Sequence, residues 1–211
     1  MPERKAPSGI QSSSSPGSAP APSAGPLAEP AIYSPMARAL HWLTVLAIAV
    51  MVPVGLFMTS RAERNIWDGL TNALYSSHKL AGLAVLLLVV CRLAYRLKQG
   101  APPDEPTLEP WQRIVSHITH WALYGLLLAV PLLGWTGISL YPALDIFGLF
   151  KLPGLVAANQ PASSTVFMFH KFGAFVLLGL VAMHVGAALF HHLIRKDGVL
   201  RRMLPGLKPR D

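Results

Sequence analysis

The sequence predicts an all-α protein, an integral membrane four-helix bundle, from its composition and from four long apolar stretches. Of the 211 residues, 52% are hydrophobic and only 13% are charged, and the mean hydropathy is +0.43. This balance is typical of a membrane protein rather than of a soluble domain. Each apolar stretch reaches the roughly 20 residues that an α-helix needs to cross a hydrocarbon core. The chain is therefore expected to cross a membrane four times.

The four expected helices occupy most of the chain after residue 33. They span residues 37–59, 77–97, 114–140 and 165–194. Pro53 and Pro131 lie inside the first and the third of them, where membrane helices tolerate proline and commonly kink. Together the helices define one transmembrane domain over residues 33–206.

The remaining segments are read from their composition. Residues 1–32 are rich in Ser, Pro and Ala, contain no apolar run long enough for a signal peptide, and are expected to form a disordered tail. A short second tail is expected at 207–211. The connection at 98–112 is polar and Pro-rich, whereas the one at 141–164 is semi-apolar. The latter indicates a segment at the membrane interface, through Phe147, Leu149, Phe150 and Leu152.

The distribution of positive charge predicts the orientation in the membrane. The two terminal segments and the 98–112 connection, with their flanks, carry 13 of the 18 Lys and Arg residues, and the opposite side carries the other 5. By the positive-inside rule, both termini lie in the cytoplasm. This asymmetry also accounts for most of the net charge of +8, so no nucleic-acid partner is expected.

Two histidines of the last expected helix, His170 and His184, lie fourteen residues apart in an apolar stretch. At about 100° and 1.5 Å per residue, they share nearly one helix face and are separated by about 21 Å along the axis. One helix can therefore offer a ligand at two depths of the membrane. With the predicted topology, His41 matches the depth of His184 on the cytoplasmic half, and His78 matches His170 near the outer face.

These two depth-matched pairs, His41 with His184 and His78 with His170, predict two haems. Neutral imidazole is a strong iron ligand, and a haem with two protein ligands has no open position for oxygen, which suits electron transfer. A single histidine in a membrane helix can instead be a packed core residue. Four that sort into two depths favour haem, because burying ionisable groups in a membrane is costly.

Glycines stand close to three of these histidines in the sequence, and they have two interpretations. They are Gly82, Gly173 and Gly186. Residues three or four apart share a helix face, so these glycines could make room for a porphyrin. They could equally serve only close packing between helices, as small residues do in membrane bundles.

Other polar residues near the histidines keep alternative roles. Arg38 could bind a haem propionate or anchor its helix at the cytoplasmic face. Lys79 and Lys171 each follow an outer histidine, and could pair with propionates, attract an anionic reductant, or simply reach the interface.

Four further histidines lie near the cytoplasmic ends of the last two helices: His117, His120, His191 and His192. They could contact haem propionates or a quinone head group, or be plain interfacial residues, and we expect His120 to contact the cofactor. The H-x-x-H spacing of the first two could also bind zinc, but the sequence shows no further ligands of the kind zinc needs.

Four segments together resemble the bacterial cytochrome b561 family. The last is the most specific, because it combines both helix histidines, an HH pair and a basic tail in order. The resemblance covers roughly residues 33–206, but the N-terminal extension lies outside it, and Pro35 stands where an arginine is common. The segments are ARALHWL (37–43), SHKLAGLAVLLLVVCRLAYRL (77–97), SHITHWALYGLLLAVPLLGW (116–135) and FHKFGAFVLLGLVAMHVGAALFHHLIRKDGVLRRMLPG (169–206).

The resemblance implies a multi-pass protein of the bacterial inner membrane that holds two haem b groups. Its ligands would be His41, His78, His170 and His184. Its role would be electron transfer between a small-molecule or protein donor on the periplasmic side and membrane quinone. Some members are similar to a superoxide oxidase, a substrate whose negative charge would suit Lys79 and Lys171.

Two alternatives to a free-standing electron carrier stay open from the sequence. One is a cytochrome subunit docked to a dehydrogenase or a hydrogenase. The other, from a different class, is a small transporter or membrane scaffold without haem. The sequence likewise leaves open whether the protein is an enzyme in its own right.

Overall fold

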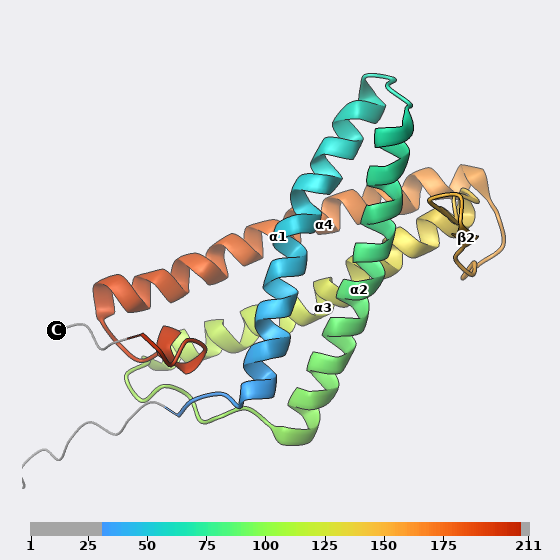
Figure 1. Ribbon diagram of the computed structural model, residues 1–211. Coiled ribbons are helices and arrows are strands. Elements are labelled where there is room, and N and C mark those ends of the chain that lie inside the picture. The colour runs from blue at the N-terminus through green and yellow to red at the C-terminus, as the bar shows by residue number, and fades with distance from the viewer. Residues whose placement is uncertain (1–30, 208–211) are drawn as a thin grey trace, which may run out of the picture.

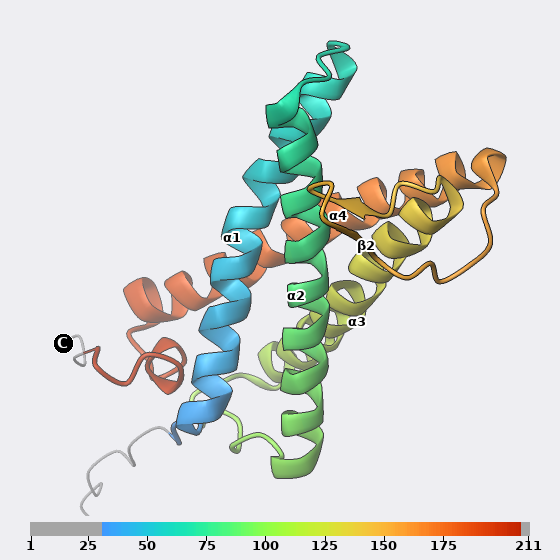
Figure 2. The same cartoon turned by 45° about the vertical axis from the view of Figure 1, so that its right-hand side comes forward.

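The computed structural model describes residues 31–207 and shows four long α-helices arranged as two hairpins (Figure 1). Helix α1 packs beside α2, and α3 packs beside α4. The two hairpins cross steeply, with α2 against α3, as the two views in Figure 1 and Figure 2 both show. The helices are α1 Pro35–Glu63, α2 Gly69–Gln99, α3 Pro110–Leu140 and α4 Gln160–Phe190.

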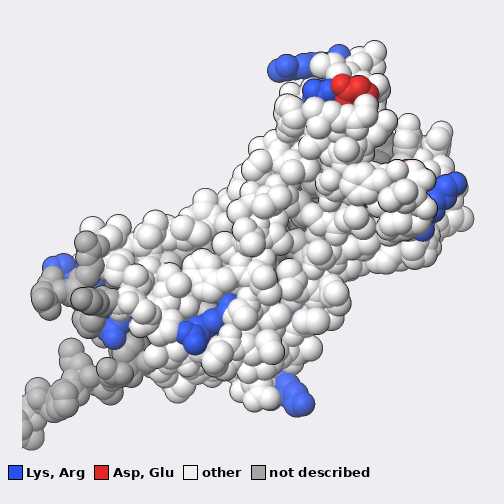
Figure 3. Space-filling model, in the orientation of Figure 1, with Lys and Arg blue, Asp and Glu red and all other residues white. Residues whose placement is uncertain are grey.

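Each of these four helices is long and apolar enough to cross a membrane. On the face drawn in Figure 3, charged side chains gather toward the ends of the hairpins and leave a broad uncharged band between them. Such a band is what a helix bundle presents to lipid. The prediction of an all-α membrane bundle of four helices is confirmed.

The helices begin earlier than their apolar stretches do, because polar residues cap them. The side chains of Ser34, Asp68 and Asn159 each accept a hydrogen bond from a backbone N–H three residues later. Such caps satisfy donors that the first helical turn leaves free. Helix α2 therefore begins at Gly69 rather than at residue 77, and its first turns carry no strong hydropathy signal.

The end of the last helix also differs from the prediction. Helix α4 ends at Phe190, and a π-helical turn follows it over His191–Arg195. This wider turn begins with the two adjacent histidines, His191 and His192. Lys196 then adopts the left-handed conformation, with a φ of 53°, and reverses the chain.

The semi-apolar connection between α3 and α4 contains a small β-hairpin that the sequence did not predict. Strands β1 (Asp145–Ile146) and β2 (Phe150–Lys151) pair antiparallel. Residues 147–149 form the turn between them, in which Phe147 and Gly148 have φ values of 53° and 72°. Ile146 is fully buried, whereas Leu149 at the tip is 81% exposed. The exposed apolar tip agrees with an interfacial position.

The hydrophobic core lies where the two hairpins cross. It consists of Val85 and Val89 from α2, Tyr124 and Leu127 from α3, and Leu177 from α4. Helix α1 contributes partly buried residues beside this cluster. On α4, His170 precedes and His184 follows the core residue Leu177, so these two histidines lie on either side of the core.

The beginning and the end of the described chain meet at one end of the bundle, as four crossings require. The backbone N–H of Tyr33 donates to the carbonyl of Arg202, and the Trp42 indole donates to the carbonyl of Met203. The Arg202 guanidinium donates in turn to the carbonyls of Ala31 and Pro102. Most of the predicted N-terminal tail, residues 1–30, and residues 208–211 lie outside the described residues.

We expect the Arg202→Ala substitution to lower stability. Arg202 is only 8% exposed, and its loss removes the donor of part-buried hydrogen bonds to the carbonyls of Ala31 and Pro102. Hydrogen bonds from a charged group are worth about 1.5–3 kcal/mol each, so the free energy of unfolding should fall by at least that much. Thermal unfolding in detergent measures it, with Arg64→Ala on an exposed site as the control. Equal melting temperatures for the two variants would contradict this role.

The N-cap of α2 is expected to make stability depend on acid. The backbone N–H of Thr71, and then the Arg61 guanidinium, hold the pKa of Asp68 below its ordinary value of 3.8. A lowered carboxyl pKa contributes stability above the ordinary value, and this contribution is lost as the pH falls through the lowered pKa. Thermal unfolding at stepped pH should therefore show wild type and Asp68→Asn converging below about pH 4. A difference independent of pH would argue against this contribution.

Candidate functional site

A cavity of about 1240 Å³ lies between the ends of the four helices that adjoin the β-hairpin. Binding sites for drug-sized ligands commonly measure about 300–1,000 Å³. This cavity therefore has space for a large flat cofactor. His78 of α2 and His170 of α4 both line it, together with mainly apolar side chains. We call it the outer site.

The imidazole rings of His78 and His170 approach each other across the outer site. Their centroids are 6.2 Å apart, and the ring planes are nearly perpendicular, at 85°. His170 Nδ1 lies 2.8 Å from the carbonyl oxygen of Val130. Because a carbonyl only accepts, Nδ1 carries the proton and Nε2 keeps its lone pair. Metal-binding histidines are commonly held by such a bond from their other ring nitrogen.

Two glycines that the sequence analysis did not single out lie against these rings. A Cβ added at Gly55 of α1 would stand 3.1 Å from the His78 ring, and one added at Gly134 of α3 would stand 3.1 Å from the His170 ring. Each ring therefore lies directly on the backbone of the neighbouring helix. Only the three-dimensional structure identifies these glycines, because each is distant in sequence from the histidine that it faces.

The glycines named from the sequence divide between the two interpretations. Gly82 lines the outer site, and an added Cβ there would meet nothing within 4 Å. Gly186 also faces open space. Gly173 is different, because an added Cβ would stand 3.1 Å from Val130. Gly173 thus serves the packing of α4 on α3.

Three histidines come together near the opposite end of the bundle, at what we call the inner site. The ring centroids of His41 and His184 are 6.3 Å apart, at an interplanar angle of 72°. His120 lies closer, with its centroid 5.2 Å from that of His184. The Nδ1 atom of His120 is 3.3 Å from the Ser116 hydroxyl. Helices α1, α3 and α4 each supply one of the three rings.

The spacing of the rings distinguishes between the possible pairs. A metal binds an imidazole nitrogen at about 2.0–2.1 Å, and the ring centroid lies about 1.1 Å further, so two axial rings on one ion have centroids about 6.3 Å apart. The pairs His78 with His170 and His41 with His184 both match this value, at 6.2 and 6.3 Å. The 5.2 Å separation of His120 from His184 is too short for that arrangement.

Buried ring nitrogens also fit an iron ligand set. Within residues 31–207, His41 Nδ1 is buried and has no hydrogen-bond partner. His78 Nδ1 is also buried without a well-formed hydrogen bond, although the His78 ring approaches the backbone of Met51. An unpartnered buried nitrogen is costly, and either an iron bond or a group bound nearby would compensate for it. Together with the cavity and the ring spacing, these atoms show that the residues present suit haem.

The two lysines next to the outer histidines have different environments. Lys79 Nζ donates to the carbonyls of Ala143 and Asp145, at 3.0 and 2.6 Å, and so ties α2 to the β-hairpin. Lys171 is 66% exposed, and its Nζ lies 3.9 Å from Glu63. Both line the outer site, but only Lys171 is open to an approaching anion.

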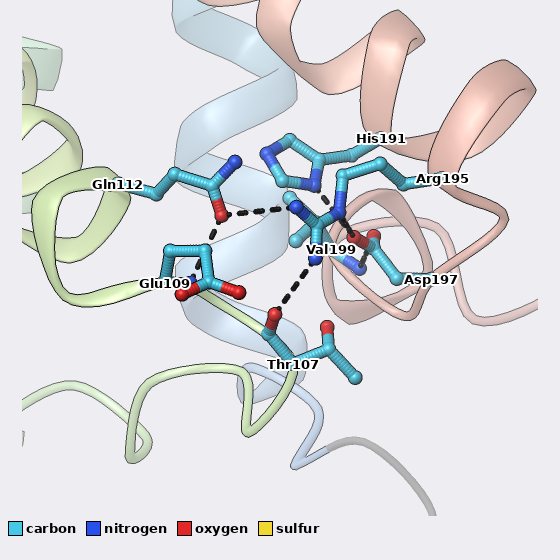
Figure 4. A network of polar contacts seen from close by, with 7 residues as sticks. All are labelled: Thr107, Glu109, Gln112, His191, Arg195, Asp197 and Val199. Carbon is cyan, nitrogen blue, oxygen red and sulfur yellow. Dashed lines mark hydrogen bonds and ion pairs between the residues drawn. The ribbon is translucent and has the colours of Figure 1, made fainter.

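The remaining histidines lie outside the two histidine pairs. His117 pairs with Asp104 at 3.1 Å on the surface. His191 is buried, and its Nδ1 lies 2.6 Å from Asp197, whose carboxylate also contacts Arg195 (Figure 4). This network joins the π-helical turn to the start of α3. Within residues 31–207, no cluster of three or more His, Cys, Asp or Glu side chains could hold a metal ion, so zinc gains no support.

Comparison with known proteins agrees with this geometry. Residues 32–206 match the family described as prokaryotic cytochrome b561. The chain is 30% identical to cytochrome b561 homolog 2 of Escherichia coli (strain K12), over 83% of this chain and 92% of the relative. It is 31% identical to cytochrome b561 homolog 1 of the same organism, over 80% and 94%. It is 29% identical to a probable superoxide oxidase, CybB, of Yersinia pestis, over 82% and 96%.

The match extends over nearly all of the described residues and includes the four helices with their histidines. It favours an electron carrier over the alternative of a transporter or scaffold without haem. The protein is a multi-pass bacterial membrane protein whose family carries electrons and binds haem b. The chain belongs to the prokaryotic cytochrome b561 family.

Proposed function

We propose that the chain holds two haem b groups, one between His78 and His170 and the other between His41 and His184. The observation that carries this proposal is the separation of the ring centroids, 6.2 and 6.3 Å, in two independent pairs. When bound, such haems accept and release single electrons without binding oxygen. The side chains around them set the position of each ring.

The two sites lie at opposite ends of the bundle, which supports electron transfer across the membrane. His170 and His184 are about 21 Å apart along α4, at about 1.5 Å per residue. The outer site adjoins the β-hairpin, which faces the periplasm in the proposed orientation. The inner site faces the end where the described chain begins and ends, which the proposed orientation places in the cytoplasm. Both termini are placed there on the distribution of Lys and Arg.

We further propose a small anionic donor at the outer site and quinone as the acceptor near the inner site. Superoxide is the leading donor, because a relative is named as a probable superoxide oxidase and because Lys171 is an exposed cation at the edge of the cavity. Lys79 has a structural role in this proposal, since its ammonium group is held by carbonyls. His120 is the inner residue most suited to contact a quinone or a propionate.

The function is tested in proteoliposomes that contain the haem-loaded protein and ubiquinone. Superoxide generated outside should reduce both haems and then the quinone, and superoxide dismutase should abolish the signal. A protein with both haems in place that is not reduced by superoxide would overturn the proposed donor. If an added quinol also left the haems oxidised, the proposed quinone link would fail.

Lys171→Glu is expected to slow reduction by superoxide without changing haem content. Reversing an exposed charge weakens electrostatic steering, which raises association rates by about 10- to 1,000-fold in favourable cases. Stopped-flow kinetics at low ionic strength should show a rate lower by several-fold, and the difference should shrink in salt. Lys151→Glu on the β-hairpin is the matched control. Equal effects from both substitutions would contradict a specific role for Lys171.

A further inference from the structure

A small pocket that contains two arginines lies beside His120 of the inner site, and the outer site does not extend to it. It has a volume of about 40 Å³. One water needs about 10–15 Å³ of such space, so the pocket admits a carboxylate group with a water, but no ring system. Arg92 and Arg96 of α2 line it, one helical turn apart. Its other lining residues are Tyr33, Ala37, Tyr95, Gly100, His120, Tyr124 and Met203.

The arginines that line this pocket form no ion pair with an acidic residue in the described part of the chain. The Arg92 guanidinium lies 5.3 Å from the centre of the Tyr124 ring, and that of Arg96 lies 6.0 Å from the Trp121 ring. Among residues 31–207, neither forms an ion pair with a carboxylate. Arg38 of α1 has a buried Nε without a hydrogen-bond partner. Cations inside a membrane span are costly unless they are paired, so an anion is expected here.

The position of the pocket indicates which anion this is. His120 lines the pocket together with Arg92 and Arg96, and its ring centroid lies 5.2 Å from that of His184. Haem b carries two propionate carboxylates on one edge of its ring. A guanidinium group binds a carboxylate through two parallel hydrogen bonds. A haem held by the two inner histidines would therefore have its carboxylate edge within reach of these arginines.

We propose that Arg92 and Arg96, joined by Arg38, form the binding site for the propionates of the inner haem. This inference rests on the proposed function and adds which end of the bundle the carboxylate edge of the inner haem would face. The propionates would point toward the end of the bundle where the two ends of the described chain meet. The arginine charges would also raise the reduction potential of the inner haem relative to the outer one.

The test uses the haem-loaded full chain, grown with haem labelled with ¹³C at the propionate carboxyls. Infrared difference spectra between the oxidised and reduced states identify the propionate bands by their isotope shift. In Arg92→Leu, one set of labelled bands should shift, and the potential of one haem should fall. The expected fall is a tenfold change in the ratio of reduced to oxidised haem at fixed potential, about 59 mV. Arg113→Leu, an exposed arginine on α3, should change neither quantity.

The outcomes separate this inference from the haem assignment itself. If Arg92→Leu keeps two haems and the labelled bands are unchanged, the propionate site is wrong, whatever happens to quinone reduction. If Arg92→Leu loses the inner haem, Arg92→Lys decides, because it keeps the charge but not the paired hydrogen bonds. Shifted bands in Arg92→Lys support the site, and unshifted bands overturn it. A wild-type protein that binds no haem would instead defeat the proposed function.

Discussion

Replacing His184 by alanine is expected to remove the inner haem and leave the outer haem in place. His184 and His41 would be the two axial ligands of one iron, so His41→Ala should remove the same haem. Absorbance of haem b per chain should fall by about half in each variant, because bis-histidine haem sites need both ligands. His78→Ala and His170→Ala should each remove the other haem. Redox titration identifies which of the two haems is lost.

His120→Ala is the matched control for this series. The His120 ring lies closer to the His184 ring than the His41 ring does, and their 5.2 Å centroid separation is too short for two ligands on opposite sides of one iron. The His120 variant should therefore keep both haems. If His120→Ala loses the inner haem while His41→Ala keeps it, the pairing proposed for the inner site is wrong.

Gly134→Val is expected to displace the His170 ring and release the outer haem. Even a Cβ at this position would stand 3.1 Å from the ring, and the two methyl groups of valine add further overlap. Overpacking of this kind costs about 1–3 kcal/mol. Here we expect this cost to shift the His170 ring away from its position rather than to unfold the protein. The variant should fold and keep its inner haem. Haem content and the visible spectrum measure the loss.

Gly125→Val provides the control for Gly134→Val. Both glycines belong to α3, but an added Cβ at Gly125 would meet nothing within 4 Å. The change in helix propensity from glycine to valine is the same at either position. A difference between the two variants therefore reports the contact with the His170 ring. A Gly134→Val protein with both haems and an unchanged spectrum would contradict the close placement of His170 on α3.

The helix count and the positions of the histidines could be predicted because both depend on local periodicity. Hydropathy marks a membrane helix by itself, and fourteen residues return to the same face of any α-helix. The positions of His170 and His184 along α4 could therefore be predicted without knowing how the helices pack. The structure places each beside the ring that the depth argument assigned to it, His78 and His41. Their role as iron ligands remains a prediction.

Features that depend on contacts between helices could not be predicted. Gly55 and Gly134 matter because of histidines on other helices, and no local pattern separates them from other glycines. In the sequence, Arg92 resembles any positive residue near the end of a membrane helix. Only the structure shows that it forms no ion pair with a carboxylate of residues 31–207. The β-hairpin was missed because strands of two residues are too short to show alternation.

The most direct test of the account is the number and the ligation of haems in the purified wild-type protein. Haem b determined against protein concentration should give two haems per chain, and electron paramagnetic resonance of the oxidised protein should show only low-spin iron with two imidazole ligands. A redox titration should also resolve two components of equal amplitude, one for each haem. A single haem per chain, or a haem with an open iron position, would contradict the assignment of the two histidine pairs.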